Sequence, residues 1–232
     1  MPTAERLEHL AQHYSLPGDA PARLALLLDM LAASPHSLTS VRDPAQAVEV
    51  HVADSLTGLS VSEVRAASSI ADLGSGGGFP GLVLALAVPA AHVTLVESVA
   101  KKAGFLEDAA DAMELANVTV VCARAEAWAA GLGVHDIVTA RALAPLGVLL
   151  EYAAPLLREG GTLVAWKGRR DAEEEAVAVR AAAELGMAAP ECRETEGSGA
   201  AERHLWVSVK ERPTPDRFPR RDGVARKRPL GA

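Results

Sequence analysis

The 232-residue chain has a net charge of −7, and hydrophobic residues make up 49% of it. This length and composition are typical of a soluble globular domain with a sizeable core, and no apolar run approaches the roughly 20 residues that a membrane helix needs. The N-terminal residues include acids and no apolar segment, so we predict no secretory signal. The two cysteines, Cys122 and Cys192, indicate neither a disulfide framework nor a zinc site. We therefore expect a cytoplasmic protein.

Positive charge gathers toward the C-terminus. Residues 203–232 carry nine Lys or Arg and three acids, a net charge of +6, so that residues 1–202 sum to −13. An acidic body with a basic tail favours a local contact with a polyanion such as nucleic acid, although many basic tails are only solvated.

Residues 1–68 are predicted to be helical. Apolar residues recur at helical spacing in the stretches 4–14 and 21–33. Asp43 followed by Pro44 is typical of a helix N-cap and predicts a third helix that runs toward Leu56. His9 and His13 share a face of the first helix, but no third ligand is apparent, so we predict no metal site.

From residue 69 onward, short apolar runs alternate with helix-forming stretches. Such alternation favours a parallel sheet covered by helices on both faces. The predicted strands are 69–73, 93–96, 117–122, 136–140, 161–166 and 203–209, and the predicted helices are 81–87, 99–115, 125–130, 145–157 and 171–185. We divide the chain into a helical extension (1–68), an α/β domain (69–210) and a basic arm (211–232), which is a loop or an ordered segment.

The stretch Ile70–Gly81 is the most informative part of the chain. A short apolar run contains Asp72, and five glycines follow within the eight residues 74–81 before helix-forming sequence resumes. Strand, glycine turn and helix in this order are typical of the entry to a nucleotide-binding βαβ unit. Glycine tolerates positive φ angles and lets a ligand approach the backbone closely.

Glu97 ends the next predicted strand, 23 residues after Gly74. An acid at this place can accept hydrogen bonds from the ribose hydroxyls of an adenosine, which suits NAD as well as other cofactors. Three details favour S-adenosylmethionine: Asp72 lies where a carboxylate can meet an ammonium group, the glycines are bunched, and Glu126 follows the third strand, where it can meet adenine. Each acid also has a purely structural interpretation, because Asp72 and Glu97 can cap turns and Glu126 can be an exposed first-turn residue.

With these motifs in hand, the chain resembles the bacterial small-subunit rRNA guanine-N7 methyltransferase family known as RsmG or GidB. The resemblance spans residues 42–230, and Phe79-Pro80 within the glycine loop is far more specific than the glycines. The matching stretches are His51–Ser55, Asp72–Gly81, Val96–Leu106, Arg124–Glu126, Thr139–Pro145, Lys167–Gly168, Pro219–Gly223 and Lys227–Leu230. The family pattern often has proline near Val224, and this chain has none there.

The resemblance implies a class I S-adenosylmethionine-dependent methyltransferase fold, a Rossmann-like three-layer α/β structure with a mainly parallel seven-stranded sheet and an N-terminal helical extension. It implies methyl transfer to N7 of a guanosine in the 530 loop of 16S rRNA, in free rRNA or a ribosomal particle, by a protein expected to be a monomer. Together with the pattern above, it predicts cofactor contacts at Asp72, Gly74, Gly76, Phe79, Glu97, Ser98, Val99, Ala125, Glu126 and Arg141.

The chemistry fits this residue set. Guanine N7 has a lone pair and no proton, so its methylation needs no general base, and we leave the catalytic residues unassigned. Candidates that can position the reactants are Arg141, Lys167, His51 and Asp54, each of which also has a structural interpretation as an ion pair, a surface residue or a helix contact. RNA phosphates are expected to meet Arg220, Arg221, Lys227 and Arg228.

Other functions stay open at this point. A small-molecule methyltransferase would share the fold, but the basic tail argues against it. An NAD(P)-dependent reductase would need Tyr-x-x-x-Lys, and neither Tyr14 nor Tyr152 has Lys four residues on. A non-catalytic ribosome-assembly factor would not need the intact glycine loop with its acids.

Overall fold

A computed structural model describes residues 2–36, 38–195 and 203–232, and in them seven strands form one sheet in the order β3-β2-β1-β4-β5-β7-β6. Strands β1 to β5 are parallel, whereas β7 is antiparallel to both β5 and β6. The strands are β1 (Ser69–Leu73), β2 (His92–Val96), β3 (Val118–Val121), β4 (His135–Arg141), β5 (Leu157–Lys167), β6 (Glu191–Glu194) and β7 (His204–Val209). The expected mainly parallel, seven-stranded sheet is thus confirmed.

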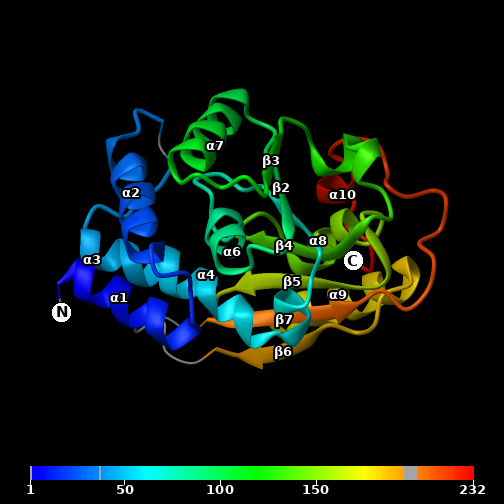
Figure 1. Ribbon diagram of the computed structural model, residues 1–232. Helices are drawn as coiled ribbons and strands as arrows, with labels where there is room; N and C mark the ends of the chain where they lie inside the picture. Colours follow the sequence, from blue (N-terminus) through cyan, green and yellow to red (C-terminus); the bar gives the residue numbers. More distant parts are fainter. Residues whose placement is uncertain (1, 37, 196–202) are drawn as a thin grey trace.

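Helices cover both faces of this sheet (Figure 1). They are α1 (Thr3–Tyr14), α2 (Ala20–Ala33), α3 (Pro44–Ala47), α4 (Asp54–Leu56), α5 (Ser62–Arg65), α6 (Gly81–Ala87), α7 (Ala100–Ala112), α8 (Leu146–Ala153), α9 (Ala172–Leu185) and α10 (Val224–Lys227). The N-terminal extension (residues 2–36 and 38–68), with α6 and α7, packs on one face around alternate strand residues such as Ile70 and Val93. Helices α8 to α10 pack on the other face, around Ala71 and Leu73.

The predicted third helix exists, but its path contains a π-helical segment. Asp43 caps α3 by accepting a hydrogen bond from the Gln46 N–H at 2.7 Å, as its sequence predicts. A π-helix over Val48–Ala53 then joins α3 to α4. π-Helical turns frequently accompany functional sites, and this one carries His51.

Three other expectations need correction. The helix predicted over residues 125–130 is two 3₁₀ turns, Ala125–Ala127 and Ala129–Gly131, and the helix predicted over 145–157 ends at Ala153. Leu157 already pairs with His135 of β4, ahead of a register shift in that pair of strands. Strand β6 was not expected, because this short edge strand is polar and is held mainly by its pairing with β7.

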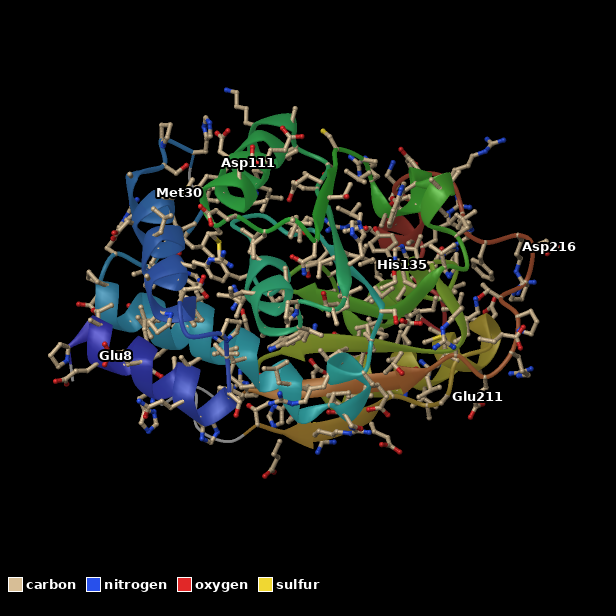
Figure 2. The ribbon with its side chains drawn as sticks, viewed as in Figure 1. Glu8, Met30, Asp111, His135, Glu211 and Asp216 are labelled. Carbon is tan, nitrogen blue, oxygen red and sulfur yellow. The ribbon has the colours of Figure 1, made fainter. Side chains whose placement is uncertain are left out.

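Among the described residues, side chains between the sheet and its helices are buried, whereas side chains on the outside of the molecule are exposed. His135 lies inside the fold, where its Nδ1 is 2.8 Å from the Ser69 hydroxyl, whereas Asp216 projects from the arm at the edge of the molecule (Figure 2). No helix in this part of the chain is long and apolar enough to cross a membrane. Nor do three His, Cys, Asp or Glu side chains of these residues gather at a metal-binding site.

Gly81 begins α6, and we expect its replacement by alanine to destabilise the protein by about 1–3 kcal/mol through overpacking. A Cβ at Gly81 would lie 2.7 Å from Asp72 Oδ2, a carboxylate that hydrogen bonds hold in place. Gly104 in α7 is the matched control, because a Cβ there meets nothing within 4 Å and alanine favours helix. Urea unfolding of both variants tests this, and a Gly81→Ala protein as stable as wild type would contradict it.

Candidate functional site

The glycine loop joins β1 to α6 at the carboxyl edge of the sheet, where parallel α/β sheets bind ligands. Gly74, Gly76 and Gly78 have φ angles of 67°, 55° and 92°, which side chains other than glycine rarely tolerate. The Gly74 N–H donates to the Val96 carbonyl at 2.8 Å and thereby ties the loop to the end of β2. The bunched glycines are therefore a requirement of this backbone path.

Asp72 supports the loop from beneath. Its carboxylate is fully buried, and it accepts hydrogen bonds from the Thr139 hydroxyl at 2.7 Å and from the Gly81 N–H at 3.3 Å. Burial raises the pKa of Asp72 to about 6. These hydrogen bonds support the interpretation that Asp72 stabilises the loop, whereas its contact with a ligand's ammonium group stays a prediction.

Glu97 joins the glycine loop to the turn before α7. Only 5% of this residue is exposed, and its two carboxylate oxygens accept from the Gly76 N–H at 3.1 Å and the Val99 N–H at 2.9 Å. Two carboxylate oxygens offer about four acceptor positions, so two positions remain for further donors. Glu97 therefore caps the turn and still has the capacity to bind the two hydroxyls of a ribose.

A hollow of about 220 Å³ opens at the ends of β1, β2 and β3. Four predicted cofactor residues line it, namely Gly74, Ser98, Ala125 and Glu126. Its other lining residues, which the sequence analysis did not assign to the cofactor, are Val96, Ala123, Arg124, Leu143, Tyr152 and Arg226. The volume is below the roughly 300–1,000 Å³ of typical small-molecule sites, so a whole nucleoside cofactor would extend beyond the hollow along the strand ends.

A second group of predicted residues, here called the Arg141 cluster, comprises Arg141, His51, Asp54 and Phe79. Arg141 is the last residue of β4, and its Nη1 donates to Asp54 Oδ2 at 3.0 Å and to the Val50 carbonyl at 2.8 Å. The guanidinium lies 5.6 Å from the Phe79 ring centroid, and the His51 ring stacks on Phe79 at 4.8 Å. The structure therefore brings the glycine loop, the end of β4 and the N-terminal helices together.

Burial and two nearby cations, Arg141 and Arg203, lower the pKa of His51 to about 4. Arg141 Nη2 lies 3.4 Å from His51 Nδ1, and since a guanidinium only donates, Nδ1 is the accepting nitrogen. The proton then resides on Nε2, which lies 2.9 Å from the Thr39 hydroxyl oxygen. His51 is a neutral packing and hydrogen-bonding residue at pH 7.

The candidate Lys167 and the four predicted phosphate-binding residues differ in their surroundings. Lys167 pairs with Glu174 at 2.6 Å, and Arg220 forms a two-pronged pair with the buried carboxylate of Glu151. Both cations are already neutralised, so their positions favour anchoring of the fold over RNA contact. In contrast, the side chains of the remaining three are exposed and pair with no carboxylate among the described residues: Arg221, Lys227 and Arg228.

The lowered pKa of His51 links stability to pH. The unfolded histidine takes up a proton near pH 6.5 and the folded one only near pH 4, so acidification between these values costs stability on the order of 2–3 kcal/mol. We expect His51→Asn to lose less stability than wild type between pH 7 and 4.5 in urea unfolding, with exposed His92→Asn as control. Parallel pH profiles of the His51 variant and wild type would contradict this.

Solved structures share the fold. The S-adenosylmethionine-dependent methyltransferase SibL superposes with a TM-score of 0.60 at 14% identity, covering 90% of this chain and 70% of SibL. A 16S rRNA (adenine(1408)-N(1))-methyltransferase from Catenulisporales acidiphilia gives 0.53 at 18% identity, covering 66% and 91%. At such low identity these neighbours show the fold alone, which is that of class I methyltransferases, as expected.

Sequence relatives are much closer. A protein of Chloroflexus aggregans named ribosomal RNA small subunit methyltransferase G is 43% identical over 197 residues, which cover 84% of this chain and 82% of the relative. A protein of the same name from Desulfitobacterium hafniense is 36% identical over 231 residues, covering 97% and 95%. The model of the GidB family, described as rRNA small subunit methyltransferase G, matches residues 23–206. The chain therefore belongs to the GidB family of rRNA small subunit methyltransferases G.

Proposed function

We propose that this protein transfers a methyl group from S-adenosylmethionine to N7 of a guanosine in the 530 loop of 16S rRNA. The observation that carries the proposal is the glycine loop held by Glu97 beside the hollow at the strand ends, in a chain that belongs to the GidB family. The family membership supports methylation of small-subunit rRNA, and the nature of the site residues supports the nucleoside cofactor.

The residues at the strand ends fit this cofactor. Glu97 retains acceptor positions for two ribose hydroxyls, and a Cβ at Gly76 would meet only the Gly74 carbonyl oxygen at 3.7 Å, so the backbone there is open to close approach. When bound, S-adenosylmethionine supplies an electrophilic methyl group. We assign its adenosine part to the residues that line the hollow and the Glu97–Val99 turn, and its remainder to the loop residues Gly76 and Phe79.

In our proposal, Asp72 and Arg141 do not contact the reacting atoms but position the residues that do. Asp72 braces the loop through the Gly81 N–H, and Arg141 holds Phe79 and the N-terminal helices through Asp54 and His51. A neutral His51 and a charge-paired Asp54 suit a reaction that needs no general base, because guanine N7 bears no proton. Catalysis then depends on orientation of the two reactants and on local electrostatics.

The exposed cations of the arm supply the RNA contact in this proposal. Arg221, Lys227 and Arg228 have no carboxylate partner among the described residues and are free to meet phosphates. Lys167 and Arg220 instead hold the fold together, since Glu174 and Glu151 already neutralise them. The contact is therefore electrostatic and depends on salt concentration.

We further propose that the protein works as a monomer in the cytoplasm, where rRNA is made. Among the described residues, the exposed large apolar side chains are scattered over α2, the turn before α7, the loop before β4 and α9, and such scattered residues do not mark an interface. They are Leu26, Val99, Leu132, Val134 and Val179. Light scattering coupled to gel filtration should give the mass of one chain, and the mass of two would contradict this.

The decisive experiment is a search for 7-methylguanosine in 16S rRNA from a deletion strain. Borohydride and aniline cleave RNA at this nucleoside, and primer extension then maps the cleavage site. We expect cleavage in the 530 loop to disappear on deletion and to return when the gene is restored. An unchanged pattern would refute the proposal, and methyl transfer by the purified protein to a metabolite but not to rRNA would favour a small-molecule methyltransferase.

Removal of the Glu97 carboxylate should weaken cofactor binding at least tenfold, since charge-assisted hydrogen bonds contribute roughly 1.5–3 kcal/mol each. Calorimetric titration with S-adenosylhomocysteine measures this for Glu97→Ala and Glu97→Gln. Exposed Glu107→Ala in α7 is the control. Wild-type affinity in both Glu97 variants would leave Glu97 with its capping role alone.

The exposed arm cations should set the salt dependence of RNA binding. Each phosphate contact contributes roughly 0.7–0.9 to the slope of log K against log salt, so the triple change Arg221→Ala, Lys227→Ala and Arg228→Ala should lower that slope by about 2. Arg158→Ala, which removes one positive charge near the amino-terminal end of β5, is the control. Filter binding to a 16S rRNA fragment at several salt concentrations measures the slopes, and equal slopes would contradict the assignment.

A further inference from the structure

The C-terminal arm is anchored on both sides of α10. Before α10, Phe218 is buried and Arg220 pairs with Glu151 of α8. After it, Leu230 is buried, and Arg180 of α9 donates to the Gly231 carbonyl at 2.6 Å. Figure 1 shows α10 beside α8, which it contacts, at the same end of the molecule as the 3₁₀ turns that follow β3. The intervening segment therefore has a fixed place near the strand ends.

This anchored segment reaches the hollow at the strand ends. The Gly223 N–H donates to Glu126 Oε1 at 2.9 Å, and Arg226 Nη2 donates to the Leu143 carbonyl at 2.8 Å. Arg226 also lies near the phenol of Tyr152 in α8, which lines the same hollow. Leu143, Tyr152 and Arg226 together line the hollow. The arm thus completes a wall that the glycine loop and the strand ends leave open.

Arg226 differs from the arginines that merely anchor the arm. Arg220 and Arg217 are paired with the carboxylates of Glu151 and Glu184, whereas Arg226 contacts a neutral carbonyl, lies near a phenol and is exposed at the rim of the hollow. A guanidinium has five N–H donors and a flat face that stacks on aromatic rings. Donors therefore remain for the ring nitrogens of a base, and the face suits stacking.

We propose that Arg226 binds the adenine of the cofactor, so that the arm forms one wall of the cofactor site. This inference rests on the proposed function, because it assumes that the hollow takes a nucleoside cofactor. The same arm carries Arg221, Lys227 and Arg228 for RNA phosphates. Cofactor and RNA then contact the same short segment, and any coupling between the two binding events is reciprocal.

Calorimetry of the full-length protein with S-adenosylhomocysteine tests the role of Arg226. Arg226→Met keeps most of the aliphatic stem and removes the guanidinium, and we expect it to weaken binding about tenfold. Arg212→Met, at an exposed arginine of the same arm that donates to the Ala183 carbonyl, is the matched control and should stay within twofold of wild type. In a second measurement, S-adenosylhomocysteine should slow tryptic cleavage of the wild-type arm after Lys227 more than that of the Arg226→Met arm.

The outcomes separate this inference from the proposed function. If the wild type binds S-adenosylhomocysteine and Arg226→Met binds it with the same affinity and the same tryptic protection, the role of Arg226 is overturned. The methyltransferase proposal is then unaffected. Failure of the wild type itself to bind S-adenosylhomocysteine would refute both. Weak binding by an Arg226→Met protein that melts at the wild-type temperature supports a ligand contact. The inference is overturned in favour of a packing role if Arg226→Met and Arg226→Lys both bind weakly and both melt at a lower temperature.

Discussion

Two buried carboxylates hold the glycine loop, and the geometry of the site depends on these contacts. Asp72 binds the Gly81 N–H at the start of α6, and Glu97 binds the Gly76 N–H in the middle of the loop. A buried carboxylate is unfavourable unless hydrogen bonds satisfy it, so the loop and the acids stabilise each other. Because Glu97 also binds the Val99 N–H, the end of β2 and the start of α7 are fixed in the same arrangement.

The Arg141 cluster extends this arrangement to the N-terminal helices. Arg141 at the end of β4 binds Asp54, and the Trp166 indole of β5 donates to the Asp54 carbonyl at 2.8 Å. Asp54 is 1% exposed, and breaking a buried ion pair of this kind costs about 3–5 kcal/mol. The extension is therefore part of the site's construction, with His51 and Phe79 packed between the helices and the glycine loop.

The sequence predicts the residues at the strand ends correctly because short-range patterns of glycines and acids determine the turns there. The bunched glycines and the acids at Asp72 and Glu97 lie where a βαβ unit requires them, and β1 and α6 have their predicted bounds. The sequence does not reveal Tyr152 or Arg226, since their place in the hollow depends on how the arm packs on α8, a contact far apart in sequence. Nor does it separate Arg220 from Arg221, because only the fold shows that Glu151 neutralises one of them.

The central claim is that a nucleoside cofactor binds at the strand ends between the glycine loop and the arm. Hydrogen exchange of the full-length protein, with and without S-adenosylhomocysteine, tests this claim most directly. The account predicts slower exchange in three stretches, residues 74–81, 97–99 and 123–126, and in the arm around Arg226. Slower exchange confined to the groove between α1 and α2, with these stretches unchanged, would contradict it.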